Sequence, residues 1–188
     1  DLFSKACILF TGNAVPVGTT AKISQKDFEV VFRGCGKNET ENPLQGIFPK
    51  SDGLVLFALT LGQALSVRID ELFDSGDFAV GYVLDAVAGA AAEHAGTGFE
   101  QKFAETFKGD PEIRVLAYSP GDCGWHLSGQ EKIYECLAPE RIGISLSERF
   151  LMTPLKSVTG VLVAGKKDGH LVKPQYSFCQ VCRTRCCR

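Results

Sequence analysis

Hydrophobic and polar positions along this chain either alternate or form unbroken apolar runs, and both patterns predict strands. Residues 54–60 are a continuous apolar run, which is typical of a strand buried on both faces. Residues 27–33 alternate instead, and a strand there would place Phe28, Val30 and Phe32 on one face. The same reasoning predicts further strands at residues 113–118, 142–146 and 157–164, followed by a charged turn at residues 165–169.

Apolar residues at helical spacing predict helices in the middle of the chain. Gly76 is placed to end a helix over residues 61–73, whose apolar face would be formed by Leu61, Leu65, Ile69 and Leu72. Residues 78–94 form a long alanine-rich helix. Its small side chains predict close approach to a neighbour, most simply another helix, and they are Gly81, Ala88, Gly89, Ala91 and Ala92.

Two more helices complete the pattern and indicate the fold class. Phe99, Phe103 and Phe107 lie four residues apart, as on the core face of a third helix. Residues 129–137 form a fourth helix, which Pro139 ends. Helices segregated from antiparallel-looking strands indicate a single α+β domain. The chain lacks the regular βαβ alternation of a doubly wound nucleotide fold.

Composition and charge exclude several classes of protein. The 188 residues fit one globular, soluble domain, with 45% hydrophobic and 22% charged residues. The net charge is −2 without a basic stripe before the last few residues, which argues against binding to nucleic acid. No apolar run reaches the roughly 18 to 20 residues of a membrane span. Four of the eight cysteines are scattered and four crowd the end of the chain. A terminal cluster in a core-rich chain predicts a reduced, cytoplasmic protein rather than a secreted disulfide scaffold.

Residues 114–132, R-V-L-A-Y-S-P-G-D-C-G-W-H-L-S-G-Q-E-K, carry the strongest local signal. The predicted strand stops at Ser119-Pro120-Gly121, where the backbone must turn. Ser128 and Glu131 have capping-box spacing and would start the next helix. A strand, a glycine-bearing loop and a helix start together indicate backbone N–H groups that receive a carboxylate or phosphate.

Several side chains of this segment are candidates for chemistry. Arg114 would either hold a ligand carboxylate in a bidentate pair or form an ordinary surface ion pair. Trp125, the single tryptophan, would either cover a ligand or hold the loop in the core. Cys123 and His126 are at most half of a metal site, because two ligands alone do not make one.

A second segment, residues 148–160, reads E-R-F-L-M-T-P-L-K-S-V-T-G. Together the two segments resemble the activation domain of cobalamin-dependent methionine synthase. That family has an arginine, a Pro/Gly/Tyr loop and Cys-x-x-His before a helix, matched here by Arg114, residues 118–121, Cys123 and His126. Its later segment, E-S-F-x-M-x-P-x-x-S-V-S-G, is matched by Glu148, Phe150, Met152, Pro154, Ser157, Val158 and Gly160.

The resemblance implies a fold, a ligand and a set of ligand-binding residues. The fold would be one domain, residues 1–175, around a twisted, mainly antiparallel sheet flanked by helices. The ligand would be S-adenosylmethionine. Glu93 would face its cationic part, because Asp85-x7-Glu93 resembles the family's acidic pattern late in a helix; a solvated helix end is the alternative. The implied S-adenosylmethionine-binding residues are Glu93, Arg114, Tyr118, Ser119, Pro120, Gly121, Cys123 and Gly124.

The resemblance also implies a partner and an activity. The family helps to re-methylate an oxidised cobalamin, so this chain would dock on a corrinoid-binding protein or methyltransferase. It would present the methyl group of S-adenosylmethionine to cobalt in a reductive reactivation. An electron donor would be a further partner, whereas nucleic acid and membrane are not expected partners. No nucleophile–base pair for another reaction is evident in the sequence.

The end of the chain, residues 176–188, departs from that family and predicts a Cys-rich tail. Its Cys-x2-Cys-x3-Cys spacing, followed directly by another cysteine, suits an iron–sulfur cluster or zinc. A redox-active or disordered thiol tail is the alternative. The tail predicts a standalone relative of the domain, which would act either as described or as an iron–sulfur or zinc protein in electron transfer to, or docking on, a corrinoid methyltransferase. The predicted metal ligands are Cys179, Cys182, Cys186 and Cys187.

Overall fold

The structure is a computed structural model, and it describes residues 1–107 and 110–170 of the chain. Its described α-helices are α1 (Leu2–Asn13), α2 (Gln25–Arg33), α3 (Pro43–Ile47), α4 (Gln63–Asp74), α5 (Phe78–Ala104) and α6 (Gly129–Leu137). The strands are β1 (Val17–Ile23), β2 (Gly53–Thr60), β3 (Ile113–Tyr118), β4 (Ser145–Leu146), β5 (Met152–Thr153) and β6 (Ser157–Lys166). Short 3-10 helices are η1 (Phe48–Lys50), η2 (Glu105–Phe107), η3 (Pro139–Ile142) and η4 (Lys167–His170).

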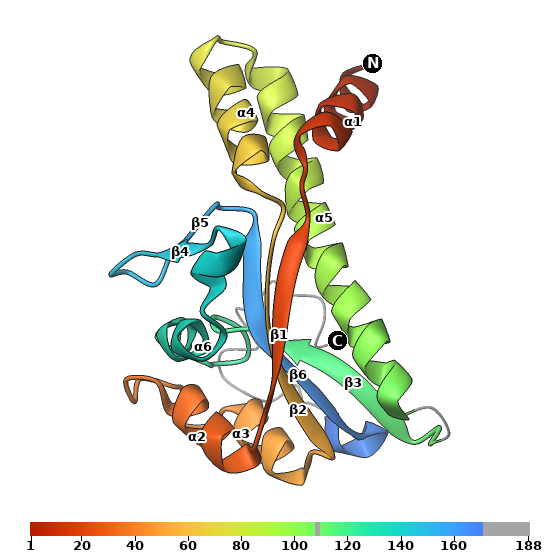
Figure 1. Cartoon of the computed structure of the whole chain (residues 1–188), viewed down its shortest axis with the longest axis vertical. Coiled ribbons are helices and arrows are strands. Elements are labelled where there is room, and N and C mark those ends of the chain that lie inside the picture. Colours follow the sequence, from red (N-terminus) through yellow and green to blue (C-terminus); the bar gives the residue numbers. More distant parts are fainter. Residues whose placement is uncertain (108–109, 171–188) are drawn as a thin grey trace. The chain divides into compact units, whose positions relative to one another are not determined.

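Most of the strands belong to one sheet. Its order is β1-β2-β6-β3, so β3 is an edge strand (Figure 1). β3 and β6 are antiparallel, with Ile113 opposite Lys166 and Tyr118 opposite Val161. β4 and β5 form a separate antiparallel pair. The α+β class with a mainly antiparallel sheet and flanking helices is therefore confirmed.

The described residues form two compact units, each assembled from segments that are far apart in the sequence. The first unit comprises Asp1–Thr19, Ala58–Thr97 and Ala138–Val158. The second unit comprises Thr20–Phe57, Gly98–Leu137 and the described residues from Thr159 onward. The predicted boundary at residue 175 and the Cys-rich tail lie outside the described residues.

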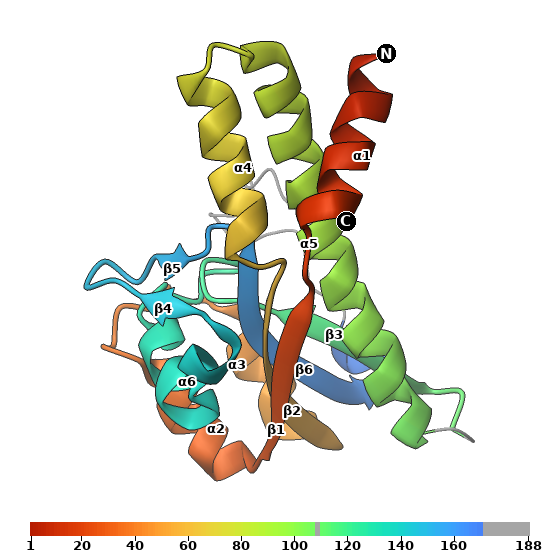
Figure 2. The ribbon, with the colours of Figure 1, turned by 45° about the horizontal axis from the view of Figure 1, so that its top comes forward.

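The first unit is built around three helical segments. α1, α4 and the first part of α5 lie side by side (Figure 2) and share an apolar cluster. A Cβ on Gly81 would lie 3.4 Å from atoms of Leu72 and Phe73, so the two helices approach closely there. The prediction that small residues pack α5 against another helix is therefore confirmed. The buried members of the cluster are Ala6, Leu61, Leu65, Ile69, Leu72, Val80, Leu84, Ala88 and Ala92.

Two elements near the start of the chain have no pattern that predicts them. α1 begins where the Asp1 side chain accepts a hydrogen bond from the Ser4 N–H at 2.7 Å. Apolar residues occur all around this helix, since Ala6 is buried whereas Phe3 and Ile8 are exposed, so helical periodicity is lost. β1 is exposed or half-buried along its length, and none of its residues is fully buried.

The predicted strand at residues 27–33 is wrong, because this segment is the helix α2. Ser24 caps it by accepting a hydrogen bond from the Asp27 N–H at 3.1 Å. The buried side chains are Phe28, Val31 and Phe32, which have helical spacing, whereas Val30 is exposed. Phe28 and Phe32 are four residues apart and suit either periodicity, so the cap decides the local structure.

The predicted helices at residues 78–94 and 99–107 are one helix, α5, followed by η2. Gly96 and Gly98 lie between the two predicted segments without ending α5, because helices tolerate single glycines at a modest cost. The Phe99 ring lies 5.8 Å from that of Phe57 on β2. Phe103 and Phe107 lie over Gly53, which confirms the prediction that this aromatic stripe belongs to the core.

The remaining elements follow the sequence pattern with small differences. β2, β3 and α6 have the predicted positions. The predicted strand at residues 142–146 is shortened to β4, because η3 occupies its start. The predicted turn at residues 165–169 is shorter too, since β6 continues to Lys166 and η4 follows. No helix in the described part of the chain has both the length and the apolar character needed to cross a membrane.

Candidate functional site

The predicted strand, loop and helix start after residue 113 are all present in the second unit. The loop between β3 and α6 is closed by its own turns. Gly121 N–H donates to the Trp125 carbonyl at 2.7 Å, and Trp125 N–H donates to the Asp122 carbonyl at 2.8 Å. Asp122 N–H donates to the Ser119 carbonyl at 3.0 Å. These three backbone donors are used within the loop, so ligand recognition cannot depend on them.

Ser128 does not form the predicted capping box. The Glu131 N–H donates to the Ser128 carbonyl at 3.2 Å, while the Ser128 hydroxyl contacts Cys35 and His126. α6 nevertheless starts at the predicted residue, Gly129. The Ser128 hydroxyl therefore makes tertiary contacts in place of the helix-capping hydrogen bond that the sequence pattern predicts.

Trp125 holds the loop in the core rather than covering a ligand. Its side chain is 1% exposed. Its ring lies 5.7 Å from Phe28 and 6.0 Å from Phe32, both on α2. A Cβ on Gly129 would lie 2.7 Å from Trp125 Cε2, so the start of α6 also closes over the indole. The loop is thereby fixed against α2, which lies beside α6.

Arg114 lies on β3 with an exposed side chain. No ion pair among the described residues includes its guanidinium. The alternative interpretation, an ordinary surface ion pair, is therefore not observed in this part of the chain. The side chain is available for a ligand carboxylate.

Tyr118 is buried, and its hydroxyl is already used. It lies 3.0 Å from His170 Nδ1, while His170 Nε2 lies 3.1 Å from the Arg114 carbonyl. A carbonyl only accepts, so Nε2 carries the proton and Nδ1 accepts from the tyrosine hydroxyl. The two hydrogen bonds fix both ends of β3. The hydroxyl of the predicted binding residue Tyr118 is therefore engaged, and its backbone is paired with Val161 of β6.

Because His170 is buried against Tyr118, we expect the stability of the protein to depend on pH. Burial is the main cause that lowers the pKa of His170 below its ordinary value, so the folded protein keeps the ring neutral. Below the ordinary histidine pKa of about 6.5, His170 binds a proton in the unfolded chain, whereas in the folded chain it stays neutral to a lower pH. The free energy of unfolding should therefore fall as the pH decreases through this range.

Urea unfolding at pH 7.5 and pH 5.5 tests this expectation. The decrease should be smaller in His170→Gln, whose side chain does not titrate. The difference between the two proteins isolates His170 from other groups that titrate in the same range. An identical pH dependence in both proteins would contradict the neutral, buried histidine.

Glu100 is a site residue that sequence reasoning missed. Its Oε1 accepts a hydrogen bond from the Ala117 N–H at 2.6 Å. This contact places a carboxylate at the outer edge of β3, in the same unit as Arg114. Glu93, the predicted acidic residue, is exposed and belongs to the first unit. The sequence does contain a signal for this residue. Glu100 follows Glu93 by seven residues, so it lies within about 20° of Glu93 around the helix.

The outer edge of β3 also offers backbone groups. Ala117 N–H points away from β6, toward Glu100. Backbone groups of alternate residues point to the same edge of a strand, so those of Val115 share this direction. An unpaired strand edge between a cation and a carboxylate can bind a polar, extended ligand through its backbone.

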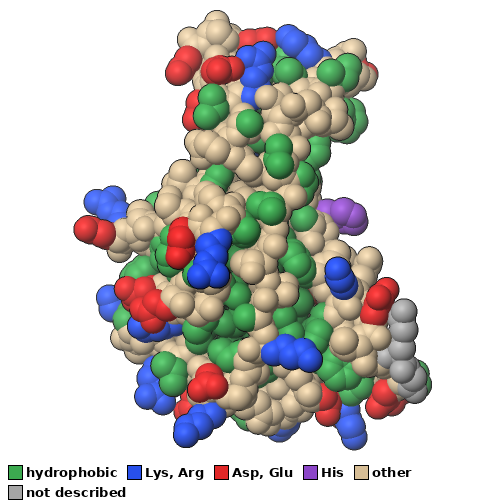
Figure 3. Space-filling view, in the orientation of Figure 1, with side chains coloured by type: hydrophobic (Ala, Val, Ile, Leu, Met, Phe, Trp, Pro, Cys, Tyr) green, Lys and Arg blue, Asp and Glu red, His purple; other side chains and the backbone are tan. Residues whose placement is uncertain are grey.

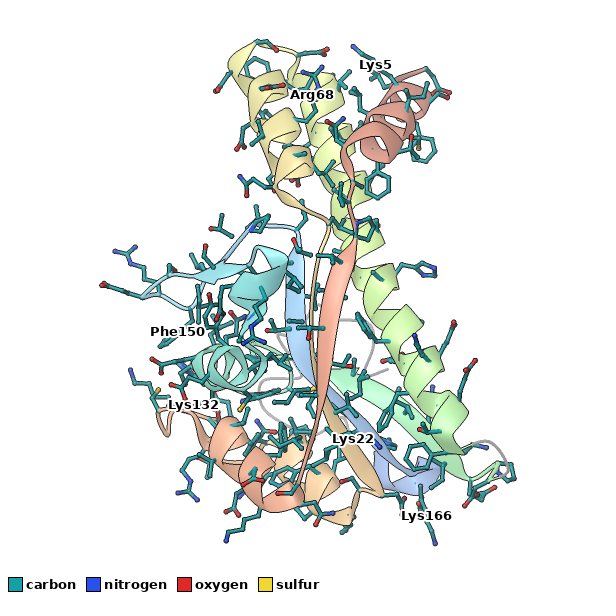
Figure 4. All side chains as sticks on the ribbon, in the orientation of Figure 1. Lys5, Lys22, Arg68, Lys132, Phe150 and Lys166 are labelled. Atoms are coloured by element: carbon teal, nitrogen blue, oxygen red, sulfur yellow. The ribbon has the colours of Figure 1, made fainter. Side chains whose placement is uncertain are left out.

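The second sequence motif has mainly structural roles. Phe150, labelled in Figure 4, lies in the turn between β4 and β5 with φ 61°. The Ser157 hydroxyl donates to the Pro154 carbonyl at 2.6 Å, and Val158 packs on the apolar cluster of the first unit. Gly160 in the second unit leaves room for the Tyr118 carbonyl and the Phe57 ring. The described contacts of this motif are thus structural.

Asp85, the other half of the predicted acidic pattern, forms an ion pair. Its carboxylate lies 2.8 Å from Lys156 Nζ, and the lysine side chain is only 12% exposed. Both residues belong to the first unit. The Asp85 carboxylate is thereby engaged with a partly buried cation.

Within the described part of the chain, Cys123 and His126 are not joined by further metal ligands. Among the described residues, no group of three or more His, Cys, Asp or Glu side chains could hold a metal ion. Cys7, Cys35 and Cys136 are free thiols. The predicted ligands in the tail, Cys179, Cys182, Cys186 and Cys187, lie outside the described residues.

On the face shown in Figure 3, lysine and arginine are interspersed with aspartate and glutamate, without a basic stripe. Two hollows occur in the second unit, of about 310 and 290 Å³. The first lies beside α2, and the second lies between β6 and η4.

Comparison with known proteins finds a likeness among solved structures but not among family models or curated proteins. No family model matches the sequence, and no curated protein matches it. Among solved structures, the chain is similar to a crystal structure of the MetH reactivation domain bound to AdoHcy, with 19% identity and a TM-score of 0.45. The match covers 64% of this chain and 42% of that chain, so this protein spans less than half of that neighbour's length. A likeness at this level assigns no ligand and no residue role.

Proposed function

We propose that this chain binds S-adenosylmethionine at the outer edge of β3 and serves as the methyl-donor platform in the reductive reactivation of a corrinoid protein. The observation that carries the proposal is that β3 contains an available arginine, Arg114, and that the Glu100 carboxylate lies at the outer edge of the same strand. Ala117, whose N–H donates a hydrogen bond to Glu100, follows Arg114 by three residues, or about 10 Å along the strand. The two ordered sequence motifs support the same ligand.

The chemistry of the ligand suits these two side chains. S-Adenosylmethionine has an α-carboxylate at one end, and its α-amino and sulfonium groups are cationic. Arg114 would hold the carboxylate through paired N–H donors. Glu100 would face the cationic groups, while the backbone of β3 and the loop at Ser119, Pro120, Gly121, Cys123 and Gly124 would contact the adenosyl part.

The proposed role of the chain is to position the methyl group. Reduction of an oxidised corrinoid is uphill, and coupling it to an irreversible methyl transfer draws it forward. The sulfonium methyl of the bound ligand supplies that step when it faces the cobalt of a partner. Fixing the donor on a rigid strand edge raises the effective concentration of the methyl group at the partner.

Methyl transfer from deuterium-labelled S-adenosylmethionine tests this function. An oxidised corrinoid protein and a one-electron reductant would be incubated with the ligand, with and without the full chain. The proposal predicts labelled methyl on the corrinoid only when the chain is present. Label at equal rates in both mixtures would contradict it.

Two matched variants decide which carboxylate meets the cationic ligand. Glu100→Gln keeps an acceptor for the Ala117 N–H but removes the charge, whereas Glu93→Gln removes a charge in the first unit. We expect Glu100→Gln to weaken binding of S-adenosylmethionine by about tenfold, since one hydrogen-bonded charge pair contributes about 1.5 kcal/mol. S-Adenosylhomocysteine, which lacks the sulfonium charge, should lose less affinity.

Calorimetric titration of both variants with both ligands measures these differences. Glu93→Gln should bind like the wild type. The opposite result, with Glu93→Gln weakened and Glu100→Gln unchanged, would assign the role to Glu93 as the sequence resemblance predicts.

A second candidate function rests on the spacing of the tail cysteines. An iron–sulfur or zinc protein that docks on a corrinoid methyltransferase, or transfers electrons to it, would need Cys179 and Cys182 but not Arg114. Iron, sulfide and zinc analysis after anaerobic purification tests it, with Cys179→Ser as the control for the tail. Absence of all three would remove this candidate.

A further inference from the structure

Two loops of the second unit meet at Cys35, a residue that the proposed function does not use. Residues 34–39 follow α2, and residues 124–128 precede α6. The Glu39 N–H donates to the Gly124 carbonyl at 2.9 Å, and the His126 N–H donates to Asn38 Oδ1 at 2.9 Å. The two loops are thus joined by specific hydrogen bonds.

The loops also approach closely at Gly34. This residue has φ 49°, and a Cβ there would lie 2.7 Å from Ser128 Oγ. A side chain would therefore separate the loops. The contact brings the thiol of Cys35 to the hydroxyl of Ser128.

Cys35, Ser128 and His126 form a chain of hydrogen bonds. Cys35 Sγ lies 3.0 Å from Ser128 Oγ, and Ser128 Oγ lies 3.0 Å from His126 Nδ1. The Ser128 N–H also donates to Nδ1 at 3.1 Å, which makes this nitrogen an acceptor. The serine hydroxyl shares the lone pair of Nδ1 with this N–H, and it accepts from the Cys35 thiol and from the Cys35 N–H at 3.2 Å. A direct path is longer, with 3.9 Å between Cys35 Sγ and Nδ1.

In this cluster the nucleophilic thiol is accessible to solvent, whereas the hydroxyl next to it is buried. Cys35 is exposed, whereas Ser128 is 1% exposed. A thiol reacts as its thiolate, and a neighbouring base that accepts the proton makes the thiolate available. The arrangement has an open sulfur, a buried relay and an imidazole acceptor.

We infer that Cys35 is a thiol–disulfide exchange site that small disulfides modify. The thiol proton passes through the Ser128 hydroxyl to His126 Nδ1, and the sulfur attacks one sulfur of the reagent. The S–S bond of the reagent breaks, a Cys35–S–S–R bond forms, and the departing thiolate takes up a proton. Cys35 is oxidised and the departing sulfur is reduced, so no other oxidant is needed.

The modification changes the junction of the two loops. A mixed disulfide removes the S–H donor and adds bulk beside Ser128. His126 follows Trp125 directly, so the loop that holds the single tryptophan will respond. The inference goes beyond the proposed function, and its test needs no S-adenosylmethionine.

The chain contains an internal control for reactivity. Cys136 on α6 is also an exposed thiol. Partial burial and the neighbouring Glu135 carboxylate raise the pKa of Cys136, which disfavours its thiolate. Among the residues that the structure describes, no serine or histidine side chain is hydrogen-bonded to Cys136. Both cysteines meet the same reagent in one sample.

The test is the rate of cystamine modification at pH 7, followed at each cysteine by peptide mass spectrometry. Cys35 should react at least about tenfold faster than Cys136, because the Cys35 thiol has a hydrogen-bonded path to an imidazole acceptor. In His126→Gln the Cys35 rate should fall by about tenfold, while an unchanged Cys136 rate would show that the fold persists. Ser128→Ala should slow Cys35 in the same way.

Two results would overturn the inference. One is a Cys35 rate no greater than that of Cys136, and the other is a Cys35 rate that His126→Gln leaves unchanged. Trp125 fluorescence gives an independent readout. It should change on modification, return with dithiothreitol and stay constant in Cys35→Ser, and constancy in the modified wild type would contradict the proposed response of the loop.

Discussion

Gly160→Ala is expected to destabilise the protein by about 3 kcal/mol, because overpacking a closely packed core forces side chains and backbone to move. A Cβ on this residue would collide with the Tyr118 carbonyl and lie 2.8 Å from Phe57 Cε1. The carbonyl belongs to β3, which pairs with β6 and cannot move without disturbing that pairing. The glycine of the second motif is therefore required for packing.

Urea unfolding followed by circular dichroism measures this effect, and Gly98→Ala is the matched control. Gly98 lies in α5, and a Cβ there would have no atom within 4 Å. Alanine at an exposed helix position should raise the free energy of unfolding by about 0.5 to 1 kcal/mol. If Gly160→Ala unfolds at the same urea concentration as the wild type, the close contact of β6 with β3 and Phe57 is contradicted.

Arg114→Ala is expected to weaken binding of S-adenosylmethionine by about 10- to 100-fold. Hydrogen bonds between charged groups contribute about 1.5 to 3 kcal/mol, which corresponds to this range of affinity. Arg114→Lys should restore only part of the affinity, because an ammonium lacks the planar pair of donors that a carboxylate receives.

A ligand without a carboxylate separates this effect from general damage to the site. Methylthioadenosine has the adenosyl part but no amino acid carboxylate, so its affinity should be the same for the wild type and Arg114→Ala. Arg141→Ala, an exposed arginine in the first unit, is the matched protein control. Equal affinity of the wild type and Arg114→Ala for S-adenosylmethionine would remove Arg114 from the site.

The parts of the fold that sequence patterns predicted are those with one dominant periodicity. β2 is an unbroken apolar run, and α4 has a regular apolar face. α2 was misassigned because Phe28 and Phe32 suit both a strand and a helix, and Ser24 decides between them. α1 escaped prediction because its apolar residues do not gather on one face.

The candidate site shows a similar division between local and distant information. Arg114 and the loop after β3 are contiguous, so the sequence motif placed them together. Glu100 reaches the strand from 17 residues earlier in the chain. The Cys35 and Ser128 contact joins residues that are 93 positions apart. Such contacts depend on tertiary structure. The seven-residue spacing from Glu93 places Glu100 on the same side of the helix, but it does not reveal the contact with β3, and no spacing indicates the contact of Cys35 with Ser128.

The central claim is that the edge of β3 binds S-adenosylmethionine, and an anaerobic calorimetric titration of the full wild-type chain tests it most directly. The account predicts saturable binding of one ligand per chain. Absence of binding at millimolar S-adenosylmethionine, in protein whose circular dichroism shows the folded state, would contradict the account.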